Sequence, residues 1–284
     1  MPCVKPANNH RISHLGIAAA LAIGLGIGSA SAAQSAGSDA PRSFLPPAPL
    51  PDAQRYEHCL QTANTDPQKA YAEAEAWRDL DGGFPAQHCA AVALIGLKKY
   101  ADAATQLEAL ANAMMKADTG MRADALDQAG QAWLLAGKPK EAKAAFDAAL
   151  DFKPKDPELL VDHAEALALA GKFSDAIDDL DVVLDQSPNR VDALVYRASA
   201  YRQLGSLDHA SADIEHALRL DPNFAPGLLE RGDLRRLKSD TAGAKADWEQ
   251  VVKLEPGTPA AASAQENLAS LTGQPSPTGQ KARP

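Results

Sequence analysis

The sequence predicts an all-α fold in which short helical hairpins stack into an α-α superhelix. Composition is the first reason: alanine is abundant and aromatic residues make up only 5% of the chain, a balance typical of helices. The second is a repeat of 34 residues through the middle of the chain, which is the mark of stacked units. The third is the apolar pattern within each unit, which recurs at i, i+3, i+4 and i+7 as in an amphipathic helix.

The N-terminal segment, residues 1–32, has the pattern of a secretory signal peptide. Basic residues precede an apolar stretch over 15–28, and small residues in an A-x-A arrangement follow it. We therefore expect cleavage after Ala32 or Ala33, export, and a periplasmic location if the source is a Gram-negative bacterium. The stretch is shorter and richer in glycine than the roughly 20 apolar residues of a membrane span. An uncleaved anchor is therefore the less favoured alternative.

Two further segments lack the pattern of a folded domain. Residues 33–51 contain five prolines among Ser, Gly and Ala, and because proline lacks an amide hydrogen and fixes φ, we expect an extended linker there. Residues 272–284 carry almost no apolar side chains to bury, so we expect a disordered tail. The helical part is therefore predicted to lie between these two segments.

The repeat is visible as columns of equivalent residues spaced 34 positions apart. Proline ends each unit, alanine occupies a close-contact position, glycine or serine occupies a turn, and a large apolar residue occupies the core. The columns are Pro154, Pro188, Pro222 and Pro256; Ala142, Ala176, Ala210 and Ala244; Gly137, Gly171, Gly205 and Ser239; and Phe146, Leu180, Ile214 and Trp248. They define four units, at 123–156, 157–190, 191–224 and 225–258.

Each unit is predicted to be a pair of antiparallel helices. In the first unit, apolar residues from Leu126 to Trp133 fall on one face of a helix, and Gly137 supplies the turn after it. A second helix over about 140–151 ends before Pro154, which disfavours helix in the preceding residue. A single hairpin cannot bury both of its faces, so the units are expected to stack into a superhelix with an extended concave surface.

The two middle units resemble the tetratricopeptide repeat (TPR) family, a 34-residue helix-turn-helix with Gly or Ala at close contacts and a terminal proline. The residues that carry the resemblance are Ala164, Gly171, Phe173, Ala176 and Pro188 in one unit, and Ala198, Tyr201, Gly205, Ala210, Ala217 and Pro222 in the next. The fourth unit departs from the pattern, with Arg235 where an aromatic residue is usual and Ser239 in place of glycine. The resemblance implies a TPR solenoid of about four regular hairpins that binds a protein or peptide segment.

Less regular helices are expected on both sides of the four units. Residues 52–122 are predicted to form one or two degenerate hairpins, with a break near Asp66 and Pro67. The unit over 84–117 lacks the final proline and runs on through Met114 and Met115. Residues 259–271 are predicted to form a capping helix. Arrays need such caps because the terminal unit otherwise exposes an apolar face.

Cys59 and Cys89 remain after export, and each follows a histidine, His58 or His88. An oxidising compartment favours a disulfide between them, and closing a loop of about 30 residues would stabilise the fold by roughly 3 to 4 kcal/mol on the chain-entropy model. Two unpaired buried cysteines are one alternative. A metal site of two histidines and two cysteines is the other, and it is disfavoured because adjacent helical residues point about 100° apart.

We find no arrangement in the sequence for catalysis, metal binding or nucleic-acid binding. His163, His209 and His216 have no Ser, Cys or paired carboxylate at a useful helical spacing. The acidic run at 178–181 lies in a helical pattern and lacks the glycine-containing loop of a calcium site. The formal net charge of -9 argues against a general nucleic-acid binder. We therefore expect no metal, no cofactor and no enzymatic activity.

One face of the repeats is a candidate binding surface. The TPR resemblance implies that the side of each first helix opposite the core lines the concave groove, where we expect its residues to be exposed. These groove residues are Asp124, Asp127, Gln131, Glu158, Val161, Asp162, Glu165, Asp192, Val195, Tyr196, Ser199, Arg202, Leu229, Glu230, Asp233 and Arg236. Some TPR domains clamp a partner's carboxylate with Lys, Asn and Arg at these places. Acids stand there in this chain, so that function is not carried over.

Two roles are open for the acids of the groove. They either attract a basic partner segment or only keep the surface soluble. On the first reading, the chain is an exported, monomeric, non-enzymatic scaffold or adaptor of the cell envelope. It would bind an extended protein segment with basic residues at one end and use Val161, Val195, Tyr196 and Leu229 as anchors. One alternative is an accessory subunit or hydrolase-associated protein with a site within 52–122. Another is a self-associating array, which the capping helix disfavours.

Overall fold

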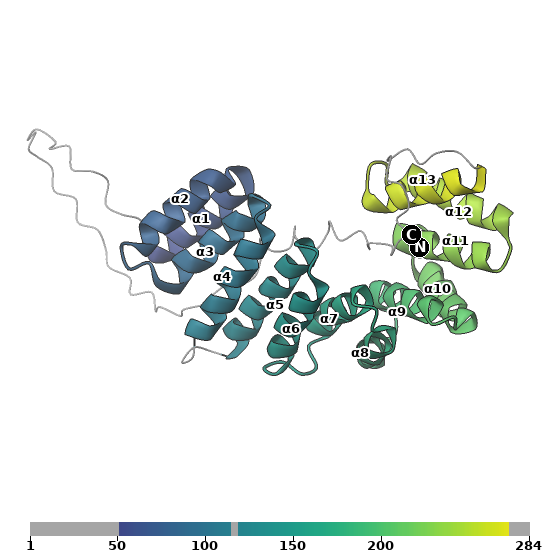
Figure 1. Cartoon of the computed structure of the whole chain (residues 1–284), viewed down its shortest axis with the longest axis horizontal. Coiled ribbons are helices and arrows are strands. Elements are labelled where there is room, and N and C mark those ends of the chain that lie inside the picture. The colour runs from purple at the N-terminus through teal and green to yellow at the C-terminus, as the bar shows by residue number, and fades with distance from the viewer. Residues whose placement is uncertain (1–50, 115–118, 273–284) are drawn as a thin grey trace, which may run out of the picture.

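The computed structural model describes residues 51–114 and 119–272, and within them the protein consists of thirteen helices and no strands (Figure 1). The helices are α1 (Asp52–Thr65), α2 (Pro67–Arg78), α3 (Gly83–Gly96), α4 (Tyr100–Ala113), α5 (Thr119–Leu135), α6 (Pro139–Leu150), α7 (Pro157–Leu169), α8 (Phe173–Gln186), α9 (Val191–Gln203), α10 (Leu207–Leu220), α11 (Ala225–Leu237), α12 (Thr241–Leu254) and α13 (Pro259–Thr272). The predicted all-α class is confirmed. The predicted signal peptide, nearly all of the linker and nearly all of the tail lie outside the described residues. No described helix combines the length and the apolar character needed to cross a bilayer.

Consecutive helices pack against each other in hairpins that follow one another along a curved array (Figure 1). Odd-numbered helices also touch across unit boundaries, as α5 does with α7, α7 with α9 and α9 with α11. Even-numbered helices of the described part make no comparable contact with one another. The odd-numbered helices therefore line the shorter, concave side of the superhelix, and the even-numbered helices line the convex side.

The repeat columns of the sequence form the core of the stacked units. Side chains of the alanine column and of the large apolar column are no more than 1% exposed in any of the four units. The two columns lie on α6, α8, α10 and α12, on the side that packs against the odd-numbered helices. The 34-residue period therefore arises because each unit places one small and one large residue at equivalent positions of the core.

Small and large residues are matched across each hairpin. In the first and fourth units a glycine on the odd-numbered helix meets a large aromatic ring, and a methyl group added to either glycine would lie no more than 3.0 Å from that ring. The middle units have alanine at the same place and a smaller aliphatic side chain opposite, and all of these residues are buried. The register pairs are Gly130 with Phe146, Ala164 with Leu180, Ala198 with Ile214, and Gly232 with Trp248.

The turn column explains why glycine recurs at the end of each first helix. Gly137, Gly171 and Gly205 have φ of 71°, 77° and 78°, in the left-handed region that a side chain disfavours. Ser239 occupies the same place in the fourth unit and adopts φ of 67°. The fourth unit thus keeps the turn geometry of the repeat without the residue that suits it.

Local interactions explain where two of the N-terminal helices begin or end. Asp66 accepts a hydrogen bond from the backbone N–H of Lys69, and Pro67 occupies the first position of α2, which produces the break that the sequence predicts. Helix α4 ends at Ala113, and the side chain of Met114, the next residue, enters the core. Met115 lies outside the described residues.

The C-terminal end of the array is covered by α13. Leu268 and Leu271 pack against the core cluster that runs from α7 to α12, and Ala260 and Ala264 are buried. The apolar face of the last unit is therefore shielded by a helix of the same chain.

Candidate partner-binding groove

The groove residues lie on the odd-numbered helices α5, α7, α9 and α11, as expected, but their exposure differs from the expectation. Only Asp124, Glu158 and Arg236 are exposed. Six are half-buried, namely Asp127, Gln131, Asp192, Tyr196, Ser199 and Arg202. Seven are buried, namely Val161, Asp162, Glu165, Val195, Leu229, Glu230 and Asp233.

The expectation that this whole face is exposed is therefore wrong. Its physical reason is the close approach of successive odd-numbered helices on the concave side, which encloses side chains that a single helix would leave in solvent. Val161, Val195 and Leu229 consequently pack into the core cluster. Of the four anchors proposed from the sequence, only Tyr196 keeps part of its side chain accessible.

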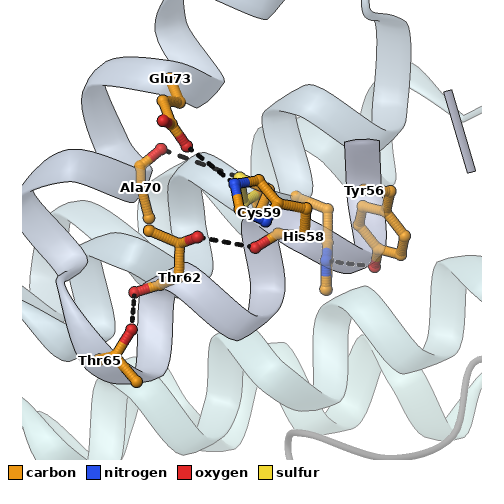
Figure 2. The surroundings of a disulfide bond; sticks show 9 residues. Tyr56, His58, Cys59, Thr62, Thr65, Ala70 and Glu73 are labelled. Atoms are coloured by element: carbon orange, nitrogen blue, oxygen red, sulfur yellow. Dashed lines mark hydrogen bonds and ion pairs between the residues drawn. A yellow bond between two sulfur atoms is a disulfide. The ribbon is translucent and has the colours of Figure 1, made fainter. Parts of the chain in front are cut away.

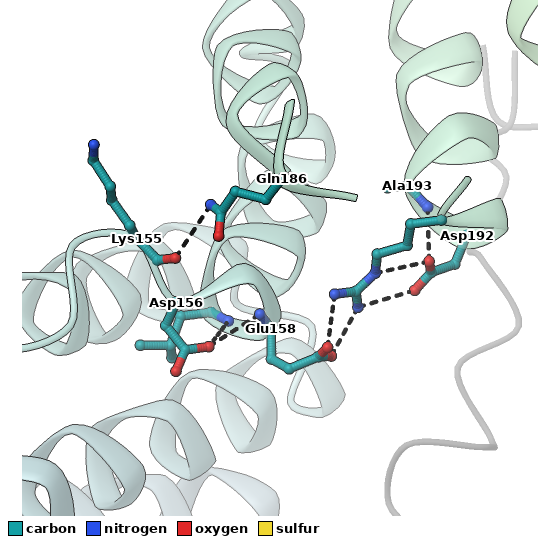
Figure 3. Close-up of polar contacts among 8 residues, drawn as sticks. Lys155, Asp156, Glu158, Gln186, Asp192 and Ala193 are labelled. Carbon is teal, nitrogen blue, oxygen red and sulfur yellow. Dashed lines mark hydrogen bonds and ion pairs between the residues drawn. The ribbon is translucent and has the colours of Figure 1, made fainter. Parts of the chain in front are cut away.

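Acids at the rim of the groove are paired with cations of the same chain. Lys153 Nζ lies 2.6 Å from Asp124 Oδ1, and this contact raises the pKa of Lys153. Arg190 donates two hydrogen bonds to Glu158, at 2.6 and 2.8 Å, and a further one from Nε to Asp192 at 3.0 Å (Figure 3). These rim acids therefore contribute less free negative charge than the sequence suggests.

The acids of the C-terminal units are bridged in the same way. Arg202 on α9 donates to Glu230 on α11 through Nε and Nη2, and its Nη2 lies 3.8 Å from Asp233. Asn267 on α13 donates to Asp233 at 2.8 Å. Burial, followed by the charge of Glu230, raises the pKa of Asp233 to about 6. The groove here is a packed network that joins α9, α11 and α13.

Asp127 of the first unit and Asp162 of the second share an amide donor. Gln131 Nε2 donates to Asp127 Oδ2 at 3.1 Å and to Asp162 Oδ2 at 3.0 Å, so one amide bridges α5 and α7. The pKa of Asp127 is raised well above its ordinary value, first by burial and next by the charge of Asp162. The other oxygen of Asp127, Oδ1, is buried and has no hydrogen bond partner.

A second set of charged residues joins the units and was not expected from the sequence pattern of single helices. Arg197 on α9 lies between Asp181 on α8 and Asp213 on α10, with 2.6 Å to Asp181 and two hydrogen bonds of 2.8 Å to Asp213. Its equivalent in the preceding unit, His163, lies 3.1 Å from Asp147 and 2.7 Å from Asp179. We call this set the inter-unit ladder.

The inter-unit ladder continues in the fourth unit and has a signature in the sequence. Arg231 pairs with Asp247 at 2.7 and 3.0 Å, and Arg235 also reaches Asp247 at 2.7 Å. A base recurs at 163, 197 and 231, and an aspartate recurs 16 positions later in each case, at 179, 213 and 247. A search for charged columns at the 34-residue period would have found these residues.

Cys59 and Cys89 are paired in the structure, with their Cα atoms 6.2 Å apart, so that α1 is linked to α3 (Figure 2). The neighbouring histidines point elsewhere. His58 Nε2 lies 3.9 Å from a carboxylate oxygen of Glu73. The two ring nitrogens of His88 form hydrogen bonds with the Tyr56 hydroxyl, at 2.8 Å, and with the side-chain oxygen of Gln128, at 2.7 Å. The N-terminal helices are thus tied together covalently and linked to α5 through His88.

The comparisons with known proteins give the repeat a family. The model of the tetratricopeptide repeat matches residues 191–224, the third unit defined by the sequence columns. No curated protein sequence matches the chain.

Solved structures share the fold. A tetratricopeptide repeat protein from Parabacteroides merdae has a TM-score of 0.57 at 17% identity, over 75% of this chain and 82% of its own. MamA from Desulfovibrio magneticus RS-1 has a TM-score of 0.50 at 19% identity, over 64% of this chain and 94% of its own. YrrB, described as a TPR protein with an unusual peptide-binding site, has a TM-score of 0.48 at 18% identity, over 66% and 94%. Four units stand in register, one of them matches the model of the tetratricopeptide repeat, and together they form an α-α superhelix with the fold of tetratricopeptide repeat proteins.

Proposed function

We propose that the protein is a non-enzymatic interaction scaffold that binds an extended segment of a partner protein along the concave side of its superhelix. One observation carries this proposal: the odd-numbered helices α5, α7, α9 and α11 line a concave side on which polar side chains such as Asp124, Gln131 and Glu158 stay at least partly accessible. A stacked array offers such a surface over several units, which suits an elongated ligand. Half-buried Tyr196 lies further along the same side.

The acidic character of this surface favours a segment with basic residues. Four acids, Asp124, Asp127, Glu158 and Asp162, lie on the concave side of α5 and α7, and two of them pair with Lys153 and Arg190. Charge complementarity would set the association rate and the choice of partner more than the final affinity. The basic part of the segment should therefore lie over the first two units.

We further propose that the protein acts in the cell envelope after removal of residues 1–32, as a monomer. The pairing of Cys59 with Cys89 supports an oxidising compartment. The cover that α13 provides for the last unit supports a monomer, because α13 occupies the apolar face on which a further unit would stack. Mass spectrometry of the mature protein should give an N-terminus at Ala33 or Gln34, and an intact Met1 in membrane fractions would contradict export.

Peptide selection tests the proposed function directly. The mature chain with its disulfide intact is used to select binders from a phage library of random dodecapeptides, and bound peptides are located by hydrogen exchange. We expect protection of α5, α7 and α9 on peptide binding. Failure to select any peptide, or protection confined to the even-numbered helices, would refute the scaffold proposal.

A further inference from the structure

One base of the inter-unit ladder differs from its equivalents in chemical type. His163 on α7 occupies the position that Arg197 occupies one unit later and Arg231 two units later. An arginine guanidinium is always charged in a protein, whereas histidine gains and loses its charge between about pH 5 and 8. The second unit is therefore joined to its neighbours by a base that can lose its charge near neutral pH.

The surroundings of His163 are those of a permanent cation elsewhere in the array. Asp147 on α6 and Asp179 on α8 lie on either side of its imidazole ring. Both acids recur 34 positions later in the sequence, where they lie on either side of Arg197. The same pair of acids that holds a guanidinium in the third unit therefore holds an imidazole in the second.

Both ring nitrogens of His163 face a carboxylate. Nδ1 lies 2.7 Å from Asp179 Oδ2, and Nε2 lies 3.1 Å from Asp147 Oδ1. Nε2 is also shielded from solvent and forms no well-aligned hydrogen bond in this arrangement. A neutral imidazole carries one N–H group and one lone pair, whereas an imidazolium carries two N–H groups. Only the imidazolium is therefore attracted to both acids at once, because the neutral ring turns a lone pair toward one of them.

The two acids depend on His163 to different extents. Asp147 also accepts from Lys143 Nζ, at 2.6 and 2.8 Å, so it keeps a cation when the imidazole is neutral. The side chain of Asp179 is 19% exposed, and the described part of the chain places no other base within 4 Å of its carboxylate. Loss of the proton from His163 would leave Asp179 as a largely enclosed carboxylate without a cation, which destabilises a folded protein.

The remaining helices around α7 bring no further carboxylate to this imidazole. Helices α5 and α9 also pack against α7, but within 51–114 and 119–272 neither places a carboxylate oxygen within 4 Å of a ring nitrogen of His163. The three acids of α7 itself lie on the concave side, turned by about 100° or more from His163 around the helix axis. The charged groups that face His163 are Asp147 and Lys143 from α6 and Asp179 from α8.

We propose that His163 is a pH-sensitive joint between the first two units of the array: when protonated it ties α6, α7 and α8 together, and when neutral it releases them. The array should loosen at this joint as pH rises through the neutral range, because the proton that attracts both acids is lost. The joints made by Arg197 and Arg231 should hold at the same pH, since a guanidinium keeps its charge. This inference goes beyond the proposed binding function and does not depend on it.

Hydrogen exchange of the full chain, with its disulfide intact, measures the strength of each joint. Protection factors, which are corrected for the intrinsic effect of pH on exchange, are compared at pH 6 and pH 8.5. In the parent, protection of α7 and α8 should fall by about tenfold or more over this range, as expected when one charge-assisted contact is lost. Protection of α11 and α12 should change much less.

Three variants separate the charge of His163 from its bulk. His163→Arg supplies a permanent cation, so protection of α7 and α8 should be nearly the same at both pH values. His163→Gln supplies a neutral side chain, so protection should already be low at pH 6. The matched control is His216→Gln, because the His216 ring contacts the Asn189 side chain instead of a carboxylate, and it should behave like the parent.

Two results would overturn the pH-sensitive joint. One is a parent protein in which protection of α7 and α8 is the same at pH 6 and pH 8.5. The other is a fall in protection that persists in His163→Gln, which would place the titrating group elsewhere. If His163→Arg does not fold, as judged by circular dichroism, the comparison of the parent with His163→Gln still decides. Peptide binding enters none of these measurements, so failure of the joint leaves the scaffold function standing.

Discussion

The two acids that flank Arg197 should contribute very differently to stability, although both lie within hydrogen-bond distance of it. Asp213 accepts two hydrogen bonds of 2.8 Å, and its side chain is 12% exposed. Asp181 accepts one of 2.6 Å, and its side chain is 47% exposed. Judged by distance alone, Asp181 would contribute more to stability. Judged by burial, Asp213 contributes more.

Burial decides the magnitude because solvent screens an exposed pair. Two unit charges about 4 Å apart attract by about 1 kcal/mol in water and about 4 kcal/mol at the effective dielectric of a protein site. Asp213→Ala should therefore lower the free energy of unfolding by about 3 kcal/mol, since removal of one partner of a buried pair is costly. Asp181→Ala should lower it by at most about 1 kcal/mol. Both changes are Asp to Ala within a helix, so the gain in helix propensity is the same for each.

Urea denaturation followed by circular dichroism at pH 7 measures both variants. In 1 M salt, the loss caused by Asp181→Ala should nearly disappear, while the loss caused by Asp213→Ala should persist, because screening acts mainly on exposed charges. An equal loss for both variants, or a larger loss for Asp181→Ala, would refute the argument from burial.

Four further changes test other parts of the structure. Gly232→Ala should destabilise the fold by about 1 to 3 kcal/mol in thermal melting, because the new methyl group would lie 2.7 Å from Trp248 Cδ1; an unchanged melting temperature would contradict the close fit. Ser239→Gly should raise the free energy of unfolding by about 1 kcal/mol, since φ is 67° there; destabilisation would count against this view. The pKa of Asp233 is raised to about 6 from 3.8, so the folded state binds more protons than the unfolded state between about pH 4 and 6, and stability should fall as pH rises through this window. Asp233→Asn should reduce that fall and stabilise the protein at pH 7 by up to about 3 kcal/mol, as seen in urea titrations at pH 4.5 and 7. Reduction of the disulfide should cost about 3 to 4 kcal/mol, and two freely alkylated thiols in the native exported protein would show that the bridge does not form.

The sequence predicts the repeat and its core well, because close packing restricts the volume allowed at each core position. Trp248 is the clearest case: it belongs to the large apolar column of the sequence, and the structure packs it against Gly232. The same reasoning identifies Ser239 as a departure, since glycine adopts the left-handed conformation of this turn more readily than serine does.

The candidate site was harder to predict, because its character depends on distances between units and not on the pattern within one helix. Periodicity places Asp162 and Glu230 on the concave side, but their burial follows from the approach of α7 and α11 to neighbouring odd-numbered helices. The inter-unit ladder depends on a register of 16 residues between two helices, so a search of single-helix faces passes over Arg197 and Asp213.

The bridge between Cys59 and Cys89 changes how the chain would respond to a pulling force. It closes a loop with a sequence separation of 30 residues, and an extended chain spans at most about 3.3 to 3.6 Å per residue. Force applied at the two ends could unravel α4 to α13 completely, yet roughly 100 Å of contour length would stay hidden behind the sulfur atoms. Single-molecule extension of the oxidised protein should therefore stop short of the reduced protein by that length.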